Sequence, residues 1–415
     1  MINRLPHTLA LAVLAASAAL AQDHWVATWA ATQQQPANAA ANAAANAGAN
    51  AGANAGGRGP AAPTGFKNQT VRMIVHTSAL TGPKLRLRLS NEYGTAPLSI
   101  GAVHVAKRAR ESEIAAGTDR AVTFGGKATF SIPAGKSILS DDVDMPLQTP
   151  ADLAVSIYVT GDSGPLTRHG LSLRSTYISK EGDFTASPSI ADATVVQSWY
   201  WLSEVDVFGP ANAETLVALG DSVTDGARST PETDHTWPAI LTQRLASNRV
   251  TAHVGVVNEG LAGNRLLTDG AGTSALGRFD RDVLNIAGVT WVALLLGIND
   301  IAHDAKADDL IAGLRQLAAQ AHSHSLRVVG CTLPAFGNAA NPVPFTEARD
   351  AVRQTVNQWI RTSRDFDSVA DFDEVTRDGA DAKKLRAEYD SGDHIHPNDA
   401  GYRAMAESFD LRQFR

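Results

Sequence analysis

Two segments that lie far apart in the chain carry the residue types that catalysis by a serine nucleophile requires. The first is the apolar run from Leu216 to Leu219, which leads into Gly220, Asp221 and Ser222. An apolar strand that ends in such a tight turn places Ser222 at the carboxyl end of the strand, where the active sites of open α/β sheets lie. Because a serine hydroxyl is a weak nucleophile on its own, it needs an adjacent base.

The second segment, Asp393-His394-Ile395-His396-Pro397, offers that base. Asp393 and His396 have a spacing at which a short loop can fold the carboxylate back onto the imidazole. Such a carboxylate fixes the tautomer of the ring and stabilises the imidazolium that forms during acyl transfer. Pro397 favours an extended backbone at His396. The two segments together predict a triad of Ser222, His396 and Asp393.

The donors that stabilise a developing oxyanion are expected in the loops after two further apolar strands. Gly263 lies in the loop after one strand, and Asn299 follows Leu294-Leu295-Leu296 and Gly297. Backbone N–H groups and Asn amides serve acyl transfer in this way, although each loop alone is more typical of an ordinary turn. We expect an oxyanion hole of Ser222 N–H, Gly263 N–H and the Asn299 side chain.

A metal site is the alternative use of the histidine segment. His394 and His396 alternate in an extended run, and Asp390 and Asp393 stand close to them. Catalytic zinc sites usually draw on three protein ligands, and the sequence has no H-E-x-x-H motif or cysteine partner elsewhere. We expect neither a metal nor a cofactor.

The elements that must position these residues are predicted to be a parallel sheet with helices. Apolar strands at 215–220, 254–257, 289–296, 326–333 and 368–372 alternate with amphipathic helices. Those helices are expected at 237–246, 308–322 and 347–362. Strands that are apolar throughout belong to a parallel sheet covered on both faces.

The preceding part of the chain has the pattern of antiparallel β-structure. Residues 84–90 alternate polar and apolar side chains, and further short runs are separated by Gly, Pro, Asp and Asn. We expect an all-β sandwich of the jelly-roll kind at 65–210, a short strand within residues 22–35 that packs elsewhere in the molecule, and a catalytic domain at 211–415. The Ala/Asn/Gly-rich tract at 36–64 has almost nothing to bury and is expected to be a loop.

The ordered set Gly-Asp-Ser, a glycine, Gly-x-Asn-Asp and Asp-x-x-His-Pro resembles the SGNH (GDSL-type) hydrolase family over about residues 213–414. The resemblance implies a three-layer α/β/α flavodoxin-like domain. It assigns Ser222 as nucleophile, His396 and Asp393 as base and partner, and Gly263 and Asn299 as oxyanion residues. Three stretches, Trp25 to Trp29, Arg88 to Asn91 and Gly392 to Pro397, are similar to stretches in exported esterases that carry an N-terminal β-sandwich. This similarity implies that residues 22–35 form a strand of that sandwich.

Composition and the N-terminal segment limit the partners and the cellular location that are expected for such an enzyme. The 415 residues have a net charge of -7 and no Lys/Arg run, so nucleic acid is not an expected partner. Residues 1–21 read as a cleavable export signal, and no later apolar stretch reaches spanning length. The protein is therefore expected to be secreted or periplasmic. With one cysteine, Cys331, it has no internal disulfide, and the thiol is expected in the core.

The predicted function is hydrolysis of carboxylic esters, with short acyl groups on carbohydrate as the favoured substrates. The resemblance extends to acetylxylan esterases and to lipases, so a lipase- or phospholipase-type acyl hydrolase is an alternative. A glycan-binding protein with an inactive or auxiliary SGNH domain is another. Trp199, Tyr200 and Trp201 could stack on sugar rings, or they could pack in the core. The sequence does not indicate an oligomeric state.

Overall fold

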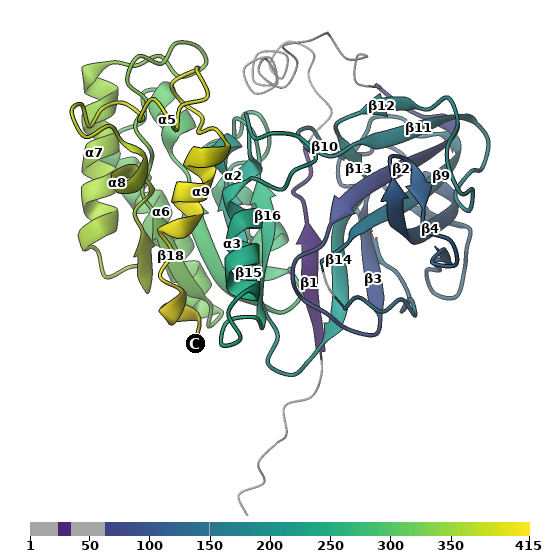
Figure 1. Ribbon diagram of the computed structural model, residues 1–415. Helices are drawn as coiled ribbons and strands as arrows, with labels where there is room; N and C mark the ends of the chain where they lie inside the picture. Colours follow the sequence, from purple (N-terminus) through teal and green to yellow (C-terminus); the bar gives the residue numbers. More distant parts are fainter. Residues whose placement is uncertain (1–23, 35–62, 149) are drawn as a thin grey trace, which may run out of the picture.

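The computed structural model describes residues 24–34, 63–148 and 150–415 (Figure 1). The predicted export signal at 1–21 and most of the tract at 36–64 lie outside this range. We call the described residues of 24–210 the β half and residues 211–415 the α/β half. In the part of the chain that is described, no helix is long and apolar enough to cross a bilayer.

The β half contains two large antiparallel sheets that share one apolar core. One sheet has the order β1-β14-β3-β8, and the other has the order β12-β11-β2-β9-β4-β5, with β6 and β7 also paired to β4. Leu85, Leu87 and Leu89 of β3 are completely buried against residues of the second sheet, such as Val71 and Ile157. The alternation in residues 84–90 therefore has the expected cause, a strand with one face in the core.

The strands of the β half are β1 (His24–Ala30), β2 (Lys67–His76), β3 (Leu85–Ser90), β4 (Leu98–Arg110), β5 (Glu113–Ile114), β6 (Arg120–Ala121), β7 (Phe130–Ile132), β8 (Ser137–Leu139), β9 (Asp152–Asp162), β10 (Arg168–His169), β11 (Thr176–Glu181), β12 (Thr194–Val196), β13 (Trp199–Tyr200) and β14 (Leu202–Gly209).

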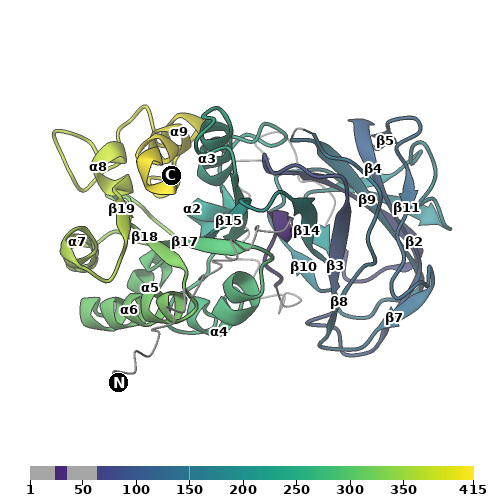
Figure 2. The same cartoon turned by 90° about the horizontal axis from the view of Figure 1, so that it is seen from below.

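The α/β half is built on a five-stranded sheet of order β16-β15-β17-β18-β19, in which every pairing is parallel. Helices lie on both sides of this sheet, with α3, α8 and α9 in one group and α4 to α7 in the other (Figure 2). The prediction of a β-rich first half and an α/β second half is confirmed. Cys331 is buried at the end of β18.

The strands of the α/β half are β15 (Glu214–Gly220), β16 (Val254–Gly260), β17 (Val289–Leu295), β18 (Arg327–Cys331) and β19 (Ser368–Ala370); the helical elements are α2 (Ser222–Asp225), α3 (Trp237–Ala246), α4 (Ala275–Phe279), η1 (Asp280–Leu284), α5 (Ile298–Ala302), α6 (Ala307–Ser323), α7 (Glu347–Thr362), α8 (Phe372–Thr376), α9 (Asp399–Glu407) and η2 (Leu411–Phe414).

Strand β1 joins the two halves. It pairs with β14 in the antiparallel sheet, and its other side lies against β15 and β16 (Figure 1). Ala27 N–H donates to the carbonyl of Ala287 over 2.9 Å, and Thr215 Oγ1 donates to the Ala27 carbonyl over 3.3 Å. The first strand of the chain is therefore packed between the two sheets rather than at an outer edge.

The structure decides between the two alternatives for the aromatic residues at 199–201. Trp199, Tyr200 and Trp201 have exposures of 9%, 0% and 0%, so they pack in the core and are not free to stack on sugar rings.

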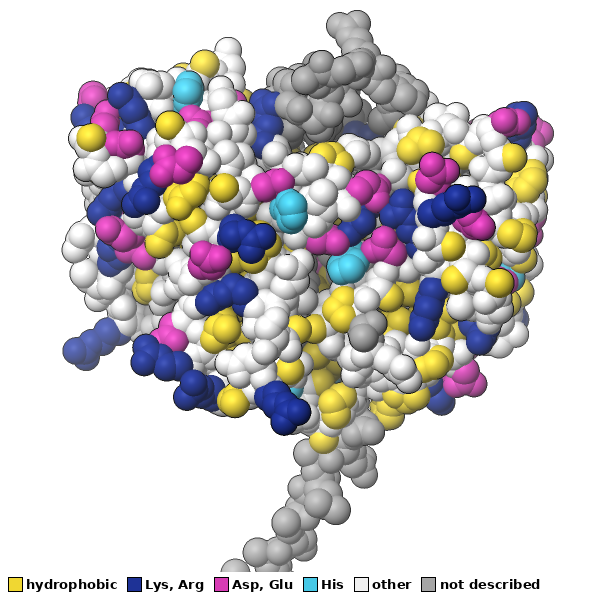
Figure 3. All heavy atoms as spheres, viewed as in Figure 1, with side chains coloured by type: hydrophobic (Ala, Val, Ile, Leu, Met, Phe, Trp, Pro, Cys, Tyr) yellow, Lys and Arg dark blue, Asp and Glu magenta, His cyan; other side chains and the backbone are white. Residues whose placement is uncertain are grey.

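On the face shown in Figure 3, acidic and basic side chains are interspersed over both halves without a continuous band of either sign.

Candidate active site

Strand β15 and the turn that follows it fix the position of Ser222. The strand ends at Gly220, where an added Cβ would lie 2.0 Å from Thr224 Oγ1, so only glycine allows this close approach. Asp221 then caps helix α2 by accepting the backbone N–H of Val223 over 3.0 Å. Ser222 is the first residue of that helix, and a backbone N–H in the first turn has no partner within the helix. Its N–H is therefore available to a ligand.

The structure brings the three residues of the predicted triad together. Ser222 Oγ lies 2.8 Å from His396 Nε2, and His396 Nδ1 lies 2.8 Å from Asp393 Oδ2. Ser222 and His396 have exposures of only 7% and 4%. With Nδ1–H directed at the carboxylate, Nε2 carries the lone pair that can accept the serine proton.

The loop before α9 holds the Asp393 carboxylate in place. Its Oδ1 accepts the backbone N–H groups of Ile395 and His396 over 3.0 and 2.9 Å. Burial works against the charged form, but the hydrogen bond and charge of His396 and these two N–H groups hold the pKa of Asp393 well below its usual range. The carboxylate therefore stays ionised beside the imidazole.

The two loops predicted to supply oxyanion donors open onto the same cavity as Ser222. Gly263 has a φ of 76°, which favours glycine, and Asn299 lies in the first turn of α5. Asn299 Nδ2 donates one hydrogen to the Asn264 carbonyl over 2.9 Å, and an amide nitrogen has a second hydrogen to offer. The Asp300 carboxylate fixes the Gly263 loop from the other side by accepting the N–H groups of Leu266 and Leu267.

The shared cavity has a volume of about 330 Å³. Ser222, Gly263, Asn299 and His396 line it, and most of the other lining side chains are small or apolar. Those others are Ala262, Arg265, Gly270, Ala271, Ile298, Ala302, His303, Pro342, Val343 and Ile395. A cavity of this size has room for an acyl group beside the serine hydroxyl.

His394 and His396 have different partners, which bears on the metal alternative. His394 Nδ1 contacts Asp390 Oδ2, whereas both ring nitrogens of His396 are directed at Asp393 and Ser222. In residues 24–34, 63–148 and 150–415, no group of three or more His, Cys, Asp or Glu side chains is placed to hold a metal ion.

Three residues around the site were not singled out by the sequence reasoning. Arg228 donates from Nε to Asp393 Oδ2 over 2.9 Å, and Asp225 Oδ2 accepts the N–H of Ala262 over 2.9 Å. His169 of the β half contacts Asp225. Arg228 and Asp225 lie within six positions of Ser222, so their proximity in sequence was the available signal. No local pattern marks His169.

In a comparison with known protein families, residues 218–404 match the model of the GDSL-like lipase/acylhydrolase family. An acetylxylan esterase of Geobacillus stearothermophilus is 25% identical over 221 residues, which cover 48% of this chain and 93% of that protein.

Solved structures of similar proteins cover the same half of the chain. A GDSL-like lipase from Bacteroides thetaiotaomicron is 20% identical and matches 48% of this chain and 86% of its own, with a TM-score of 0.37. An acetylxylan esterase from Geobacillus stearothermophilus is 23% identical and matches 48% and 94%, with a TM-score of 0.37.

Proposed function

Since this chain belongs, through residues 218–404, to the GDSL-like lipase/acylhydrolase family and is a carboxylic ester hydrolase, we propose that it removes short acyl groups from carbohydrate with Ser222 as nucleophile. The observation that carries the assignment is the continuous contact from Ser222 Oγ through His396 to Asp393, with 2.8 Å at both steps. The favoured substrate class rests on the similarity to an acetylxylan esterase.

Acylation would begin when His396 Nε2 accepts the proton of Ser222 Oγ and the oxygen attacks the ester carbonyl carbon. The carbonyl oxygen becomes negative and accepts hydrogen bonds from Ser222 N–H, Gly263 N–H and Asn299 Nδ2. The C–O bond to the alcohol then breaks, and the imidazolium returns its proton to the leaving oxygen. Asp393 stabilises the imidazolium throughout.

Deacylation repeats these steps with water. His396 Nε2 takes a proton from water, the hydroxide attacks the acyl carbon, and the bond to Ser222 Oγ breaks. The proton on the imidazolium goes to Ser222 Oγ, and the carboxylic acid leaves. An alcohol in place of water would give acyl transfer through the same acyl-enzyme.

We also propose the finer organisation of the chain that this function implies. Residues 211–415 would form a three-layer α/β/α flavodoxin-like catalytic domain, preceded by a β-sandwich domain. Residues 1–21, in which Arg4 precedes an apolar stretch and an A-x-A site, would be a cleavable export signal.

The test is a comparison of wild type and Ser222→Ala on p-nitrophenyl acetate, butyrate and octanoate, and on acetylated xylan, with and without EDTA. We expect wild type to prefer acetate and to release acetate from xylan. Ser222→Ala should lose about 10⁴- to 10⁶-fold in kcat, and EDTA should have no effect. Preference for octanoate would favour the lipase alternative. Full activity in Ser222→Ala would contradict the nucleophile assignment.

A further inference from the structure

A buried pair of ionisable residues connects the β half to the candidate active site. His169, in β10, directs Nε2 at Asp225 Oδ1 over 3.0 Å, and the two side chains have exposures of 2% and 4%. Asp225 is the last residue of helix α2, the helix that begins with Ser222. The pair therefore joins an element of the antiparallel half to the turn that carries the nucleophile.

The surroundings of His169 indicate an imidazolium. Nδ1 lies 2.9 Å from the Thr32 carbonyl, and Nε2 lies 3.1 Å from the Leu171 carbonyl as well as near Asp225. Carbonyl and carboxylate oxygens only accept hydrogen bonds, so both ring nitrogens must donate. The centroids of the Trp199 and His169 rings are 5.4 Å apart, and the two ring planes are tilted by 34°. An aromatic ring at this distance attracts a positively charged imidazole.

The charges around the pair agree with that protonation state. Burial alone would lower the pKa of His169, but the charge and hydrogen bond of Asp225 and the two carbonyls raise it above its ordinary value. Asp225 is the charged group in contact with the ring. The adjoining cavity, about 150 Å³ between the two halves, is also lined by His76, Arg174, Asp234 and His235.

Asp225 also contacts the loop that carries Gly263. Its second oxygen, Oδ2, accepts the N–H of Ala262, the residue before Gly263, over 2.9 Å. At the start of the same loop, an added Cβ on Gly260 would lie 2.1 Å from the backbone nitrogen of Asp225. Ala262 also packs in an apolar cluster with Leu171, Leu173 and Ala227. The loop is thus held against α2 by one carboxylate and covered by residues of the β half.

We propose that His169 is a positioning residue for ester hydrolysis: as an imidazolium it fixes Asp225, and Asp225 fixes the loop that presents the Gly263 N–H to the oxyanion. This inference rests on the proposed function of that loop. It assigns the β half a direct part in turnover, because the residue that orients Asp225 comes from it.

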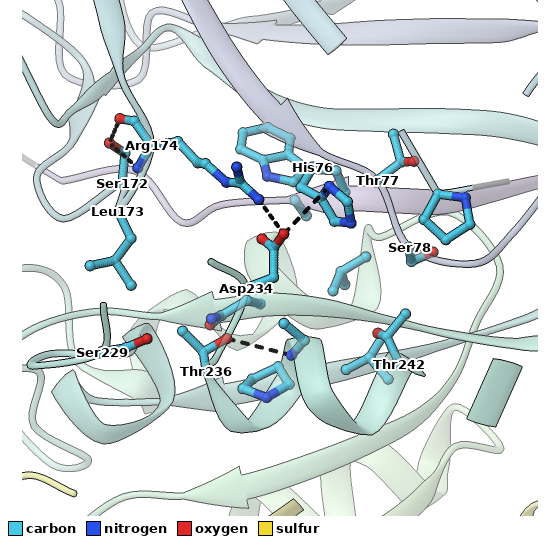
Figure 4. A pocket seen from close by; sticks show the side chains of 18 of the residues that line it. His76, Thr77, Ser78, Ser172, Leu173, Arg174, Ser229, Asp234, Thr236 and Thr242 are labelled. Atoms are coloured by element: carbon cyan, nitrogen blue, oxygen red, sulfur yellow. Dashed lines mark hydrogen bonds and ion pairs between the residues drawn. The ribbon is translucent and has the colours of Figure 1, made fainter. Parts of the chain in front are cut away.

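The experiment compares His169→Gln, Asp225→Asn and the double variant, each in the full chain, with p-nitrophenyl acetate as substrate. His76→Gln is the matched control. His76 also contacts two carboxylates, Asp234 over 3.6 Å (Figure 4) and Asp152, its neighbour on the adjacent strand, over 2.7 Å. Those carboxylates are hydrogen-bonded to His76, Arg108 and Arg174 and not to the Gly263 loop.

We expect kcat to fall by about 10- to 100-fold in His169→Gln and in Asp225→Asn, because misplacement of an oxyanion donor affects the transition state and not substrate binding. KM should stay nearly constant, and the double variant should be no worse than the poorer single variant, since the two residues act as one unit. The acid limb of the pH profile should stay in place. His76→Gln should remain within about twofold of wild type.

Other outcomes overturn the inference. They are a normal kcat in folded His169→Gln, a loss that appears in KM alone, or additive losses in the double variant. Near-UV circular dichroism checks folding; if His169→Gln does not fold, Asp225→Asn and the double variant decide, and failure of all three to fold would show a purely structural pair. Ser222→Ala in the same assay separates the two proposals: if it is active, the proposed function fails, whatever His169 does.

Discussion

Arg228 donates a hydrogen bond from Nε to the Oδ2 atom of Asp393 over 2.9 Å. That oxygen is the same atom that faces His396 Nδ1 over 2.8 Å. Their side chains have exposures of 14% for Arg228 and 21% for Asp393, so solvent screens this contact only in part. A guanidinium and an imidazole therefore share one carboxylate oxygen, and Arg228 helps to fix the carboxylate that orients His396.

Replacing Arg228 by Gln should therefore hold the Asp393 carboxylate less firmly, because it removes the guanidinium donor to Oδ2. We expect kcat for p-nitrophenyl acetate to fall by about 10-fold with KM nearly unchanged, because Asp393 orients the imidazole that accepts the serine proton. Arg228→Lys is the matched control because it keeps the charge, and both variants meet the same positive φ of 72°. A normal kcat in folded Arg228→Gln would contradict this positioning role.

Asn299 is expected to act in the transition state and not in substrate binding. Asn299→Ala removes the Nδ2 donor, so kcat and kcat/KM for p-nitrophenyl acetate should fall together by about 10²–10³-fold. Asn285→Ala, at an exposed position of the same half, is the control and should retain activity. Because Asn299 also holds the Asn264 carbonyl, the melting temperature must be measured for both variants. A rise in KM without loss of kcat would assign Asn299 to binding.

The segments with apolar residues at helical spacing over several turns were predicted correctly from the sequence. Helices α3 and α7 have the predicted bounds, and α6 is one residue longer at each end than the predicted 308–322. Helix α9 was missed because it is short and contains Gly401, which weakens helix propensity. Its signals were Asn398, which caps it, and the buried positions Tyr402, Met405 and Ala406.

Contacts between the two halves could not be predicted from the sequence. Ser222, His396, Asp393, Gly263 and Asn299 could be named because each lies in a motif at a strand end or loop. His169 could not, because its position beside Asp225 depends on how β10 packs against α2 and no local pattern encodes that packing. Their catalytic roles stay predictions until the variants are measured.

Asp221 should make the stability of the protein depend on pH. Burial raises the pKa of its carboxyl from 3.8 to about 7, and its Oδ2 has no hydrogen-bond partner among the described residues. The unfolded chain releases this proton at lower pH than the folded chain does. The folded state therefore binds more protons between about pH 4 and pH 7, and its stability falls as the pH rises through that window.

Asp221→Asn removes this titration while an amide oxygen can still cap α2. The free energy of unfolding of the variant, relative to wild type, should therefore rise between about pH 4 and pH 7 by up to about 4 kcal/mol. Urea denaturation followed by circular dichroism at several pH values measures it. Asp192→Asn, with a side chain that is 74% exposed, is the control and should show no such rise. Parallel curves for Asp221→Asn and wild type would mean that Asp221 is already ionised at low pH.

The close approach of Gly260 to helix α2 gives a steric prediction. An added Cβ would lie 2.1 Å from Asp225 N and 2.6 Å from Asp225 Cα, which are backbone atoms that cannot rotate away. Gly260→Ala must therefore push the Gly263 loop from α2, and we expect a loss of stability of about 1–3 kcal/mol and a fall in kcat. Gly161→Ala, where a Cβ would meet nothing within 4 Å, is the matched control. Equal stability and activity in the two variants would show that the loop and α2 can separate without cost, and that the oxyanion donor is not held by this contact.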